Sequence, residues 1–209
     1  MHIYTLVLGV CATNCYIFTA DDTHAVIIDP ADRASTICQT LQKHALVPVA
    51  ILLTHGHFDH IAALDELISL CGDLPVYAHE KELACLTDTS LNLSTGLFGS
   101  PFTFTQAVTP VKDGTVLDLA GLSLTVLHTP GHTAGSVCYY AKEQNTLLSG
   151  DTLFAGSIGR TDFPGGDAQA LFASLKKLEA RVLPDTVIYP GHGESTTLEK
   201  EMRYNPYLQ

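Results

Sequence analysis

The sequence contains no apolar run long enough to cross a membrane and few basic residues. A membrane-spanning helix needs about 18 or more consecutive apolar residues, so we expect no membrane partner. Lysine and arginine number 11 against 22 aspartates and glutamates, which gives a formal net charge of −11. A chain of this charge repels phosphate backbones, and no local basic patch offsets the repulsion, so we expect no nucleic-acid partner.

The sequence also lacks a C-x-x-C pair and an N-terminal secretory signal. Its six cysteines are scattered among apolar residues rather than spaced as a disulfide framework. We therefore predict reduced, buried thiols and a cytoplasmic protein.

No repeat, low-complexity tract or linker divides the chain. Its composition, 46% apolar and 16% charged, is typical of a globular protein. With about 150 residues as a loose domain size, a chain of 209 residues predicts one domain over residues 1–209.

Short apolar runs alternate with turn residues and predict strands at residues 1–8, 26–29, 50–53, 74–78, 122–127, 136–140, 146–149 and 186–189. Helical periodicity predicts helices over residues 35–44, 61–71 and 171–182, the first with Ser35 as its N-cap. Because strands and helices are interleaved, the predicted class is α/β or a layered α+β arrangement. The irregular residues 88–105 are interpreted either as a lid over an active site or as a surface connection.

The segment T-H-G-H-F-D-H, residues 54–60, follows a predicted strand and concentrates metal-ligating side chains. Alternation in an extended chain would point His55, His57 and Asp59 the same way, with His60 facing that spot from another side. Burying three imidazoles and a carboxylate together without a metal would be costly. The segment therefore predicts a metal site at the end of a strand.

Three later segments each place a donor after a predicted strand and beside a glycine: His132, Asp151 and His192. Together with the first segment they give seven nitrogen and oxygen donors. Seven groups exceed one tetrahedral site but suit two metals that share a bridging carboxylate.

This set of motifs is similar to that of the metallo-β-lactamase fold superfamily. The resemblance implies a four-layer αβ/βα sandwich with the metals at one edge. It also implies that His55, His57 and His132 bind the first metal, that Asp59, His60 and His192 bind the second, and that Asp151 bridges them. The donors suit zinc first, with iron or manganese as further possibilities.

Residues 150–162, G-D-T-L-F-A-G-S-I-G-R-T-D, resemble the glyoxalase II (hydroxyacylglutathione hydrolase) group. Only residues 194–209 follow His192, where glyoxalase II enzymes usually append a helical domain, so the resemblance is to the short bacterial branch. It implies hydrolysis of S-D-lactoylglutathione or a related small-molecule acyl-thioester by a metal-bound hydroxide that Asp59 orients. Arg160 stands where the group has a basic glutathione contact.

Residues 159–163 also resemble persulfide dioxygenases, which would use one iron held by His55, His132 and Asp151. All seven donors are present for either enzyme, so the motifs alone leave this alternative open. The complete donor set disfavours a non-catalytic binding module. The bridging aspartate, with no cysteine among the strand-end motifs, disfavours β-lactam hydrolysis.

Overall fold

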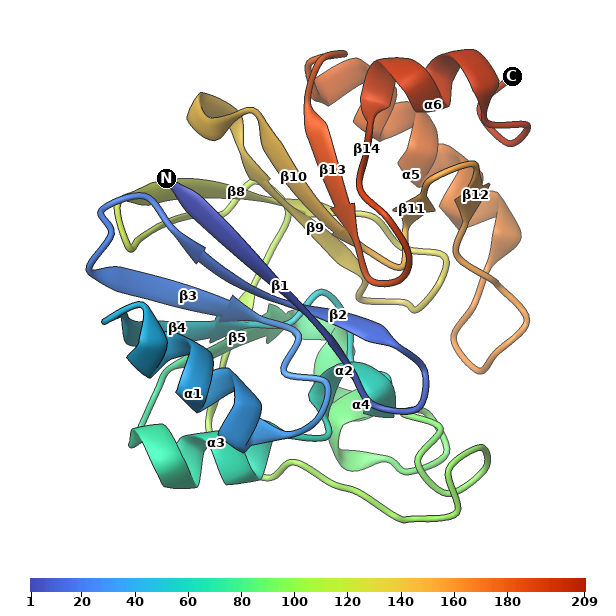
Figure 1. The fold of residues 1–209 in the computed structure, drawn as a ribbon. Helices are drawn as coiled ribbons and strands as arrows, with labels where there is room; N and C mark the ends of the chain where they lie inside the picture. The colour runs from blue at the N-terminus through green and yellow to red at the C-terminus, as the bar shows by residue number, and fades with distance from the viewer.

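Two six-stranded sheets lie face to face in the structure, a computed structural model that describes residues 1–209 (Figure 1). The first sheet has the order β1 (His2–Leu8), β2 (Thr13–Thr19), β3 (His24–Ile28), β4 (Val47–Leu52), β5 (Val76–His79) and β6 (Val108–Val111). The second has the order β14 (Thr196–Thr197), β13 (Val187–Pro190), β10 (Thr146–Gly150), β9 (Val137–Ala141), β8 (Leu122–His128) and β7 (Val116–Leu119). A short separate hairpin joins β11 (Leu153–Phe154) to β12 (Ser157–Ile158).

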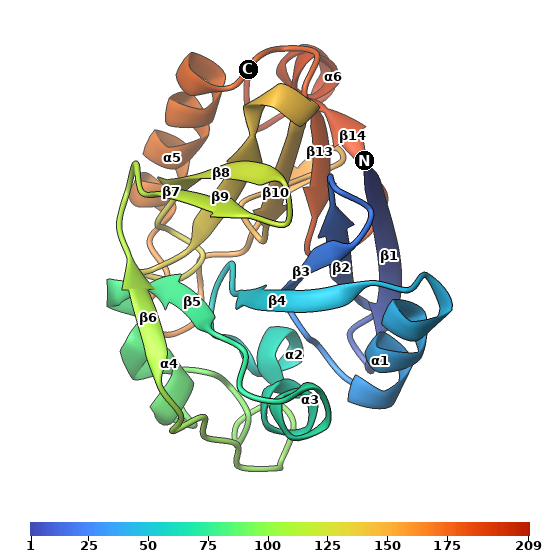
Figure 2. The ribbon, with the colours of Figure 1, turned by 90° about the vertical axis from the view of Figure 1, so that its left-hand side faces the viewer.

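Helices cover the outer face of each sheet (Figures 1 and 2). The first sheet is covered by α1 (Ala34–Lys43) and α3 (Leu64–Cys71), and the second by α5 (Ala168–Arg181) and α6 (Leu198–Tyr204). Two short helices, α2 (Phe58–Ile61) and α4 (Leu83–Thr87), follow strands β4 and β5, and single 3-10 turns occupy Glu80–Glu82 and Lys142–Gln144.

Three groups of buried apolar side chains fill the spaces between these four layers. The first joins α1 and α3 to the first sheet, the second lies between the sheets, and the third joins the second sheet to α5. Each sheet therefore buries both faces, which explains why β2, β9 and β10 are buried along their whole length rather than at alternate residues. The four-layer sandwich predicted from the family resemblance is confirmed.

The parallel pairing of the strands determines where the loops that follow them lie. Strands β3, β4, β5 and β6 pair in parallel, and so do β10 and β13. The carboxyl ends of parallel strands meet at one edge of a sheet, so the loops that follow β3, β4, β10 and β13 are brought together.

Some local expectations were wrong. Helix α1 begins after Arg33, a left-handed residue with φ 49° that forms no side-chain cap, so Ser35 is not the N-cap. The helix expected over residues 61–71 is two helices, α2 and α3, separated by Ala62 and Ala63. The six thiols are free as predicted, but only three are buried, and Cys11 is exposed. No helix combines the length and the apolar character that crossing a membrane requires.

Candidate metal centre

All seven predicted donors lie together, on loops and short elements that follow strands of the two sheets. His55 and His57 follow β4, Asp59 and His60 lie in α2, and His132, Asp151 and His192 follow β8, β10 and β13. An isolated bridge between Thr13 and His192 links the two sheets beside these donors.

A first triad consists of His55, His57 and His132, whose ligating atoms lie within 4.8 Å of one another. His57 Nδ1 is 2.9 Å from His132 Nε2. All three side chains are at most 3% exposed. The triad therefore presents three imidazole nitrogens to one enclosed point.

A second triad consists of Asp59, His60 and His192. Asp59 Oδ2 lies 3.4 Å from His192 Nε2 and 3.7 Å from His60 Nε2. The expectation that Asp59 points the same way as His55 and His57 was wrong, because residues 58–61 form a helical turn rather than an extended chain. The turn places Asp59 beside His60.

Asp151 lies between the triads and contacts both. Its Oδ1 is 3.5 Å from His60 Nε2, and its Oδ2 is 3.5 Å from both His132 Nε2 and His192 Nε2. This is the placement that a carboxylate shared by two metals requires.

The donors fit a pair of cations. The Nε2 atoms of His55, His57 and His60 and the Oδ1 of Asp151 are buried without a hydrogen-bond partner. Buried polar atoms are nearly always paired, so four unpaired atoms on residues of the two triads and on Asp151 indicate that positive partners belong here. Nitrogen and carboxylate oxygen are ligands for zinc, iron or manganese.

The two triads differ electrostatically. Burial, together with the neighbouring imidazoles, lowers the pKa of His55 and brings the pKa of His57 to about 3. Burial also opposes protonation of His60 and His192, but Asp151 and Asp59 outweigh it and raise their pKa to about 9 and about 10. His55 and His57 therefore offer neutral imidazoles, the form that ligates metals, while the second triad attracts positive charge.

Both aspartates favour the ionised form despite their burial. Burial raises the pKa of both, but His60 and His192 together outweigh it, holding the pKa of Asp151 at about 2 and lowering that of Asp59 as well.

Asp29 holds histidines of both triads through hydrogen bonds, a role that was not predicted from the sequence. Its carboxylate accepts hydrogen bonds from the Thr54 amide (2.8 Å), the Thr54 hydroxyl (2.6 Å) and His60 Nδ1 (2.9 Å). Because the Thr54 hydroxyl donates to Asp29, it accepts from His55 Nδ1, 3.1 Å away. These bonds fix the ring tautomers so that Nε2 of both histidines carries a lone pair. With its oxygens engaged in this way, Asp29 holds ligands rather than a metal. Its signal was present in the sequence, as a carboxylate at the end of a predicted strand.

Glu82, which is 1% exposed, joins the two loops of the first triad. One carboxylate oxygen accepts from the Gly56 amide and the other from the Thr133 hydroxyl, each at 2.9 Å. Glu82 thereby fixes the loop of His55 and His57 against the loop of His132. No local pattern in the sequence indicates this role.

The remaining ligands are fixed by backbone contacts. His132 Nδ1 donates to the carbonyl of Arg160 at 2.8 Å, which leaves Nε2 free for a metal. Asn14 donates to the carbonyls of Pro190 and Gly193 on either side of His192. A Cβ at Gly191 would collide with Asp151 Oδ1, so only glycine allows Asp151 to approach this loop.

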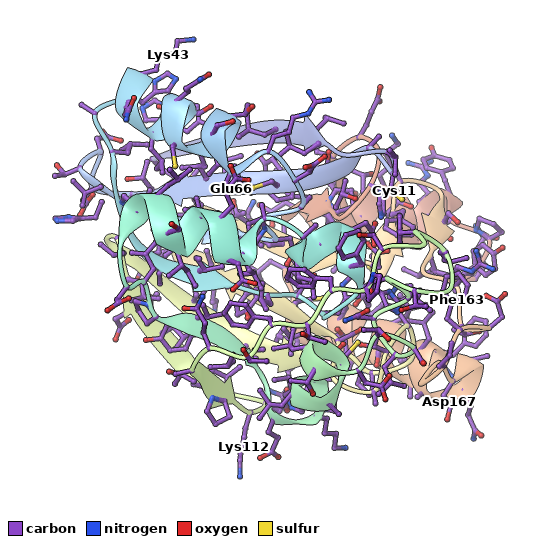
Figure 3. The ribbon with its side chains drawn as sticks, turned by 90° about the horizontal axis from the view of Figure 1, so that it is seen from below. Cys11, Lys43, Glu66, Lys112, Phe163 and Asp167 are labelled. Carbon is purple, nitrogen blue, oxygen red and sulfur yellow. The ribbon has the colours of Figure 1, made fainter.

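A cavity of about 360 Å³ opens over the donors, and we call it the metal cavity. Besides the ligands, it is lined mainly by the apolar side chains of Leu93, Leu97, Phe98, Phe154, Ile158 and Phe163. Three of these belong to residues 88–105, which therefore form a wall of the site. Figure 3 shows Cys11 and Phe163 at the same end of the molecule, and both line this cavity.

Arg160 lines the metal cavity as well, but its guanidinium is already engaged. Its Nε and Nη2 donate to the two carboxylate oxygens of Asp162 at 2.7 and 2.6 Å, and it lies 3.8 Å above the ring of Phe163. Arg160 thus lies next to the proposed ligands with its charge largely compensated by Asp162, and its contact with a substrate stays a prediction.

Known proteins are similar to this chain in sequence and in fold. The model of the metallo-beta-lactamase superfamily matches residues 8–192. The hydroxyacylglutathione hydrolase GloC of Haemophilus influenzae is 36% identical over 199 residues, covering 93% of this chain and 92% of that protein. The solved BLEG-1 B3 metallo-beta-lactamase is 41% identical, with a TM-score of 0.94 over 100% of both chains. TTHA1623, solved in a di-iron-bound form, is 40% identical, with a TM-score of 0.88 over 98% of this chain and 100% of that one.

Proposed function

Because the chain belongs to the metallo-beta-lactamase superfamily, we propose that it is a metal-dependent thioester hydrolase of glyoxalase II type. Its substrate is S-D-lactoylglutathione or a related acyl-thioester. The observation that carries the proposal is the position of Asp151 in contact with two ligand triads beneath one cavity. The similarity to GloC supports the substrate class.

In this proposal His55, His57 and His132 hold one divalent ion, Asp59, His60 and His192 hold the other, and Asp151 bridges them. When bound, two such ions supply Lewis acidity, polarising a carbonyl and acidifying a water. The donor set suits zinc first, and the di-iron form of TTHA1623 supports iron as well.

Asp59 is the proposed catalytic residue. Its carboxylate favours the ionised form, lines the metal cavity and accepts a hydrogen bond from the Thr13 hydroxyl at 3.0 Å. It can therefore accept a further hydrogen bond from the attacking water and direct the water's lone pair at the thioester carbonyl.

The leaving group favours a thioester over an amide. A thiol has a pKa of about 8.5, so a thiolate leaves without prior protonation, whereas an amine needs a proton in the transition state. Apart from the histidines proposed as metal ligands, the only basic side chain that lines the metal cavity is Arg160, whose guanidinium does not give up its proton at neutral pH.

β-Lactam hydrolysis is a second candidate, because the BLEG-1 B3 metallo-beta-lactamase matches this chain over its whole length. Apart from the proposed metal ligands and the paired Arg160, only the Cys11 thiol could donate a proton to the amine leaving group in the metal cavity, so we expect any such activity to be slow compared with thioester hydrolysis.

The decisive experiment counts metals in anaerobically purified protein and assays it with S-D-lactoylglutathione, nitrocefin and glutathione persulfide. Two metals per chain with thioester hydrolysis and no oxygen uptake are expected. One iron with persulfide-dependent oxygen uptake would replace the hydrolase by a dioxygenase, and dominant nitrocefin turnover would replace it by a β-lactamase. Asp151→Ala should lose at least one metal, whereas the exposed Asp73→Ala should keep both.

A further inference from the structure

A second cavity of about 300 Å³ adjoins the metal cavity, and we call it the side cavity. Asp59 and Phe98 line both cavities, so the two adjoin at these residues, next to the second triad. The walls of the side cavity come from four segments: the turn between β1 and β2, the loop after β3, helix α2 and the irregular residues 88–105.

The walls of the side cavity are mainly apolar. They are formed by Val10, Ala31, Phe58, Ala62 and Phe98. The rings of Phe58 and Phe98 pack with their centroids 5.0 Å apart, and Phe102 supports Phe58 at 5.5 Å. Val10, at the tip of the turn, is 91% exposed. An exposed valine opposite an aromatic wall is an unpartnered apolar surface next to reactive groups.

The charges near the side cavity exclude an anionic occupant. Apart from Asp59, its only ionisable lining residue is Asp32, and no lysine or arginine lines it. Apart from the histidines proposed as metal ligands, the one basic side chain of the adjoining metal cavity, Arg160, is paired with Asp162. Lys43 and Lys112 lie away from the end of the molecule that carries Cys11 and Phe163 (Figure 3).

On this basis we infer that the side cavity binds the acyl group of the substrate, and that this group is an apolar chain of medium length. The inference rests on the proposed thioester hydrolysis and names its substrate class. A carbonyl over the metal ligands has two substituents, and the side cavity offers an apolar, cation-free space to one of them. The polar thiol carrier then occupies the side of the metal cavity that contains Arg160.

The volume of the side cavity limits the length of the acyl chain that it can hold. A methylene group and a water molecule are of similar size, and a water occupies about 30 Å³ of liquid, so the cavity accommodates roughly six to ten heavy atoms. Burying one methylene group changes an equilibrium by up to about four-fold. Acyl chains should therefore gain kcat/KM with length up to about eight carbons and gain nothing beyond that.

The test uses thioesters of one small neutral thiol, N-acetylcysteamine, with acetyl, butanoyl, hexanoyl, octanoyl and dodecanoyl groups. For the metal-loaded protein, kcat/KM for the octanoyl ester should exceed that for the acetyl ester by at least about 50-fold, since six further methylenes are buried. Ala62→Phe, which fills the side cavity, should lower this ratio at least ten-fold. Ser100→Phe should do the same from the exposed rim without disturbing the core. Ala173→Phe, the same substitution on the exposed face of α5, should leave the ratio unchanged.

A ratio near one, or a ratio that neither cavity variant changes, would overturn the inference. So would variants that change selectivity among thiol carriers at constant acyl group instead. Calorimetric binding of octanoate and acetate to the metal-loaded protein gives a second readout, in which octanoate should bind at least ten-fold more tightly. If no thioester is hydrolysed at all, the proposed function fails, and octanoate binding still decides the role of the side cavity.

Discussion

The substitution Asp29→Asn tests whether the metal centre depends on a carboxylate that binds no metal in the proposal. Asp29 accepts three hydrogen bonds within 2.9 Å, from the Thr54 amide, the Thr54 hydroxyl and His60 Nδ1. Asparagine has the same shape but only one acceptor oxygen. One side of the former carboxylate must therefore become an NH2 group.

Either orientation of the amide is unfavourable. If its nitrogen faces the Thr54 amide, two N–H groups oppose each other in a buried site. If it faces His60, it forces the tautomer with hydrogen on Nε2, which cannot ligate a metal. A buried unsatisfied group costs about 1–3 kcal/mol, and losing an outer partner of a metal-bound histidine costs about 10- to 100-fold in metal affinity.

We therefore expect Asp29→Asn to lower the unfolding free energy of the metal-free protein by about 2 kcal/mol. At a chelator concentration at which the unsubstituted protein still retains two metals per chain, we expect the variant to retain one. Urea unfolding followed by circular dichroism and metal analysis after dialysis measure the two effects. The matched control is Asp21→Asn, because exposed Asp21 also accepts two backbone amides, at 2.9 and 2.7 Å, and lies 2.9 Å from His24 Nδ1. Two tightly held metals and unchanged stability in the Asp29 variant would refute the reasoning.

Three further predictions concern stability and metal content. Glu82→Ala removes the acceptor that joins the two loops of the first triad, so unfolding free energy in urea should fall by about 2–4 kcal/mol. Glu82→Gln, which keeps one acceptor, should lose less, and equal losses would contradict the bridging role. Gly191→Ala places a Cβ against the bridging carboxylate and should abolish binding of at least one metal. Gly96→Ala, where an added Cβ meets nothing within 4 Å, should retain both metals, and retention by both variants would contradict the packing argument. Burial and the stacked His128 lower the pKa of His79 to about 4. In the unfolded chain the pKa of His79 is ~6.5, so between pH 6.5 and 4 the unfolded chain binds a proton at His79 that the folded protein does not. Stability of the metal-free protein should fall as the pH falls from 6.5 to 4, and His79→Phe should flatten this slope, while an unchanged slope would remove His79 as its source.

Much of the fold, and the seven donors that the fold brings together, could be read from local patterns in the sequence. The apolar run before T-H-G-H-F-D-H predicts a strand, and strand β4 ends at Leu52, just before these residues. Donors placed beside glycines after three later strands, His132, Asp151 and His192, also lie in the centre. Such predictions succeed because strand length, turn chemistry and ligand type are properties of a few consecutive residues.

Local conformation was less predictable than the presence of a ligand. The sequence places Asp59 two residues after His57, but only the folded turn of α2 separates the two residues into different triads. Periodicity predicted one helix where tertiary packing forms two, α2 and α3. A short helical turn and an extended segment differ little in local energy, so contacts with the rest of the chain decide between them.

By itself, then, the sequence determined the layered class, the strand ends and the identity of the donors. Only the tertiary structure decided which residues support those donors. Glu82 and Asp29 contact the ligand loops from sequence separations of 26 and 25 residues, and Asn14 reaches the loop of His192 across 176 residues. The side cavity depends in the same way on four segments that meet only when the sheets pack. Contacts of this range arise from burial and strand order, which no short window of sequence contains.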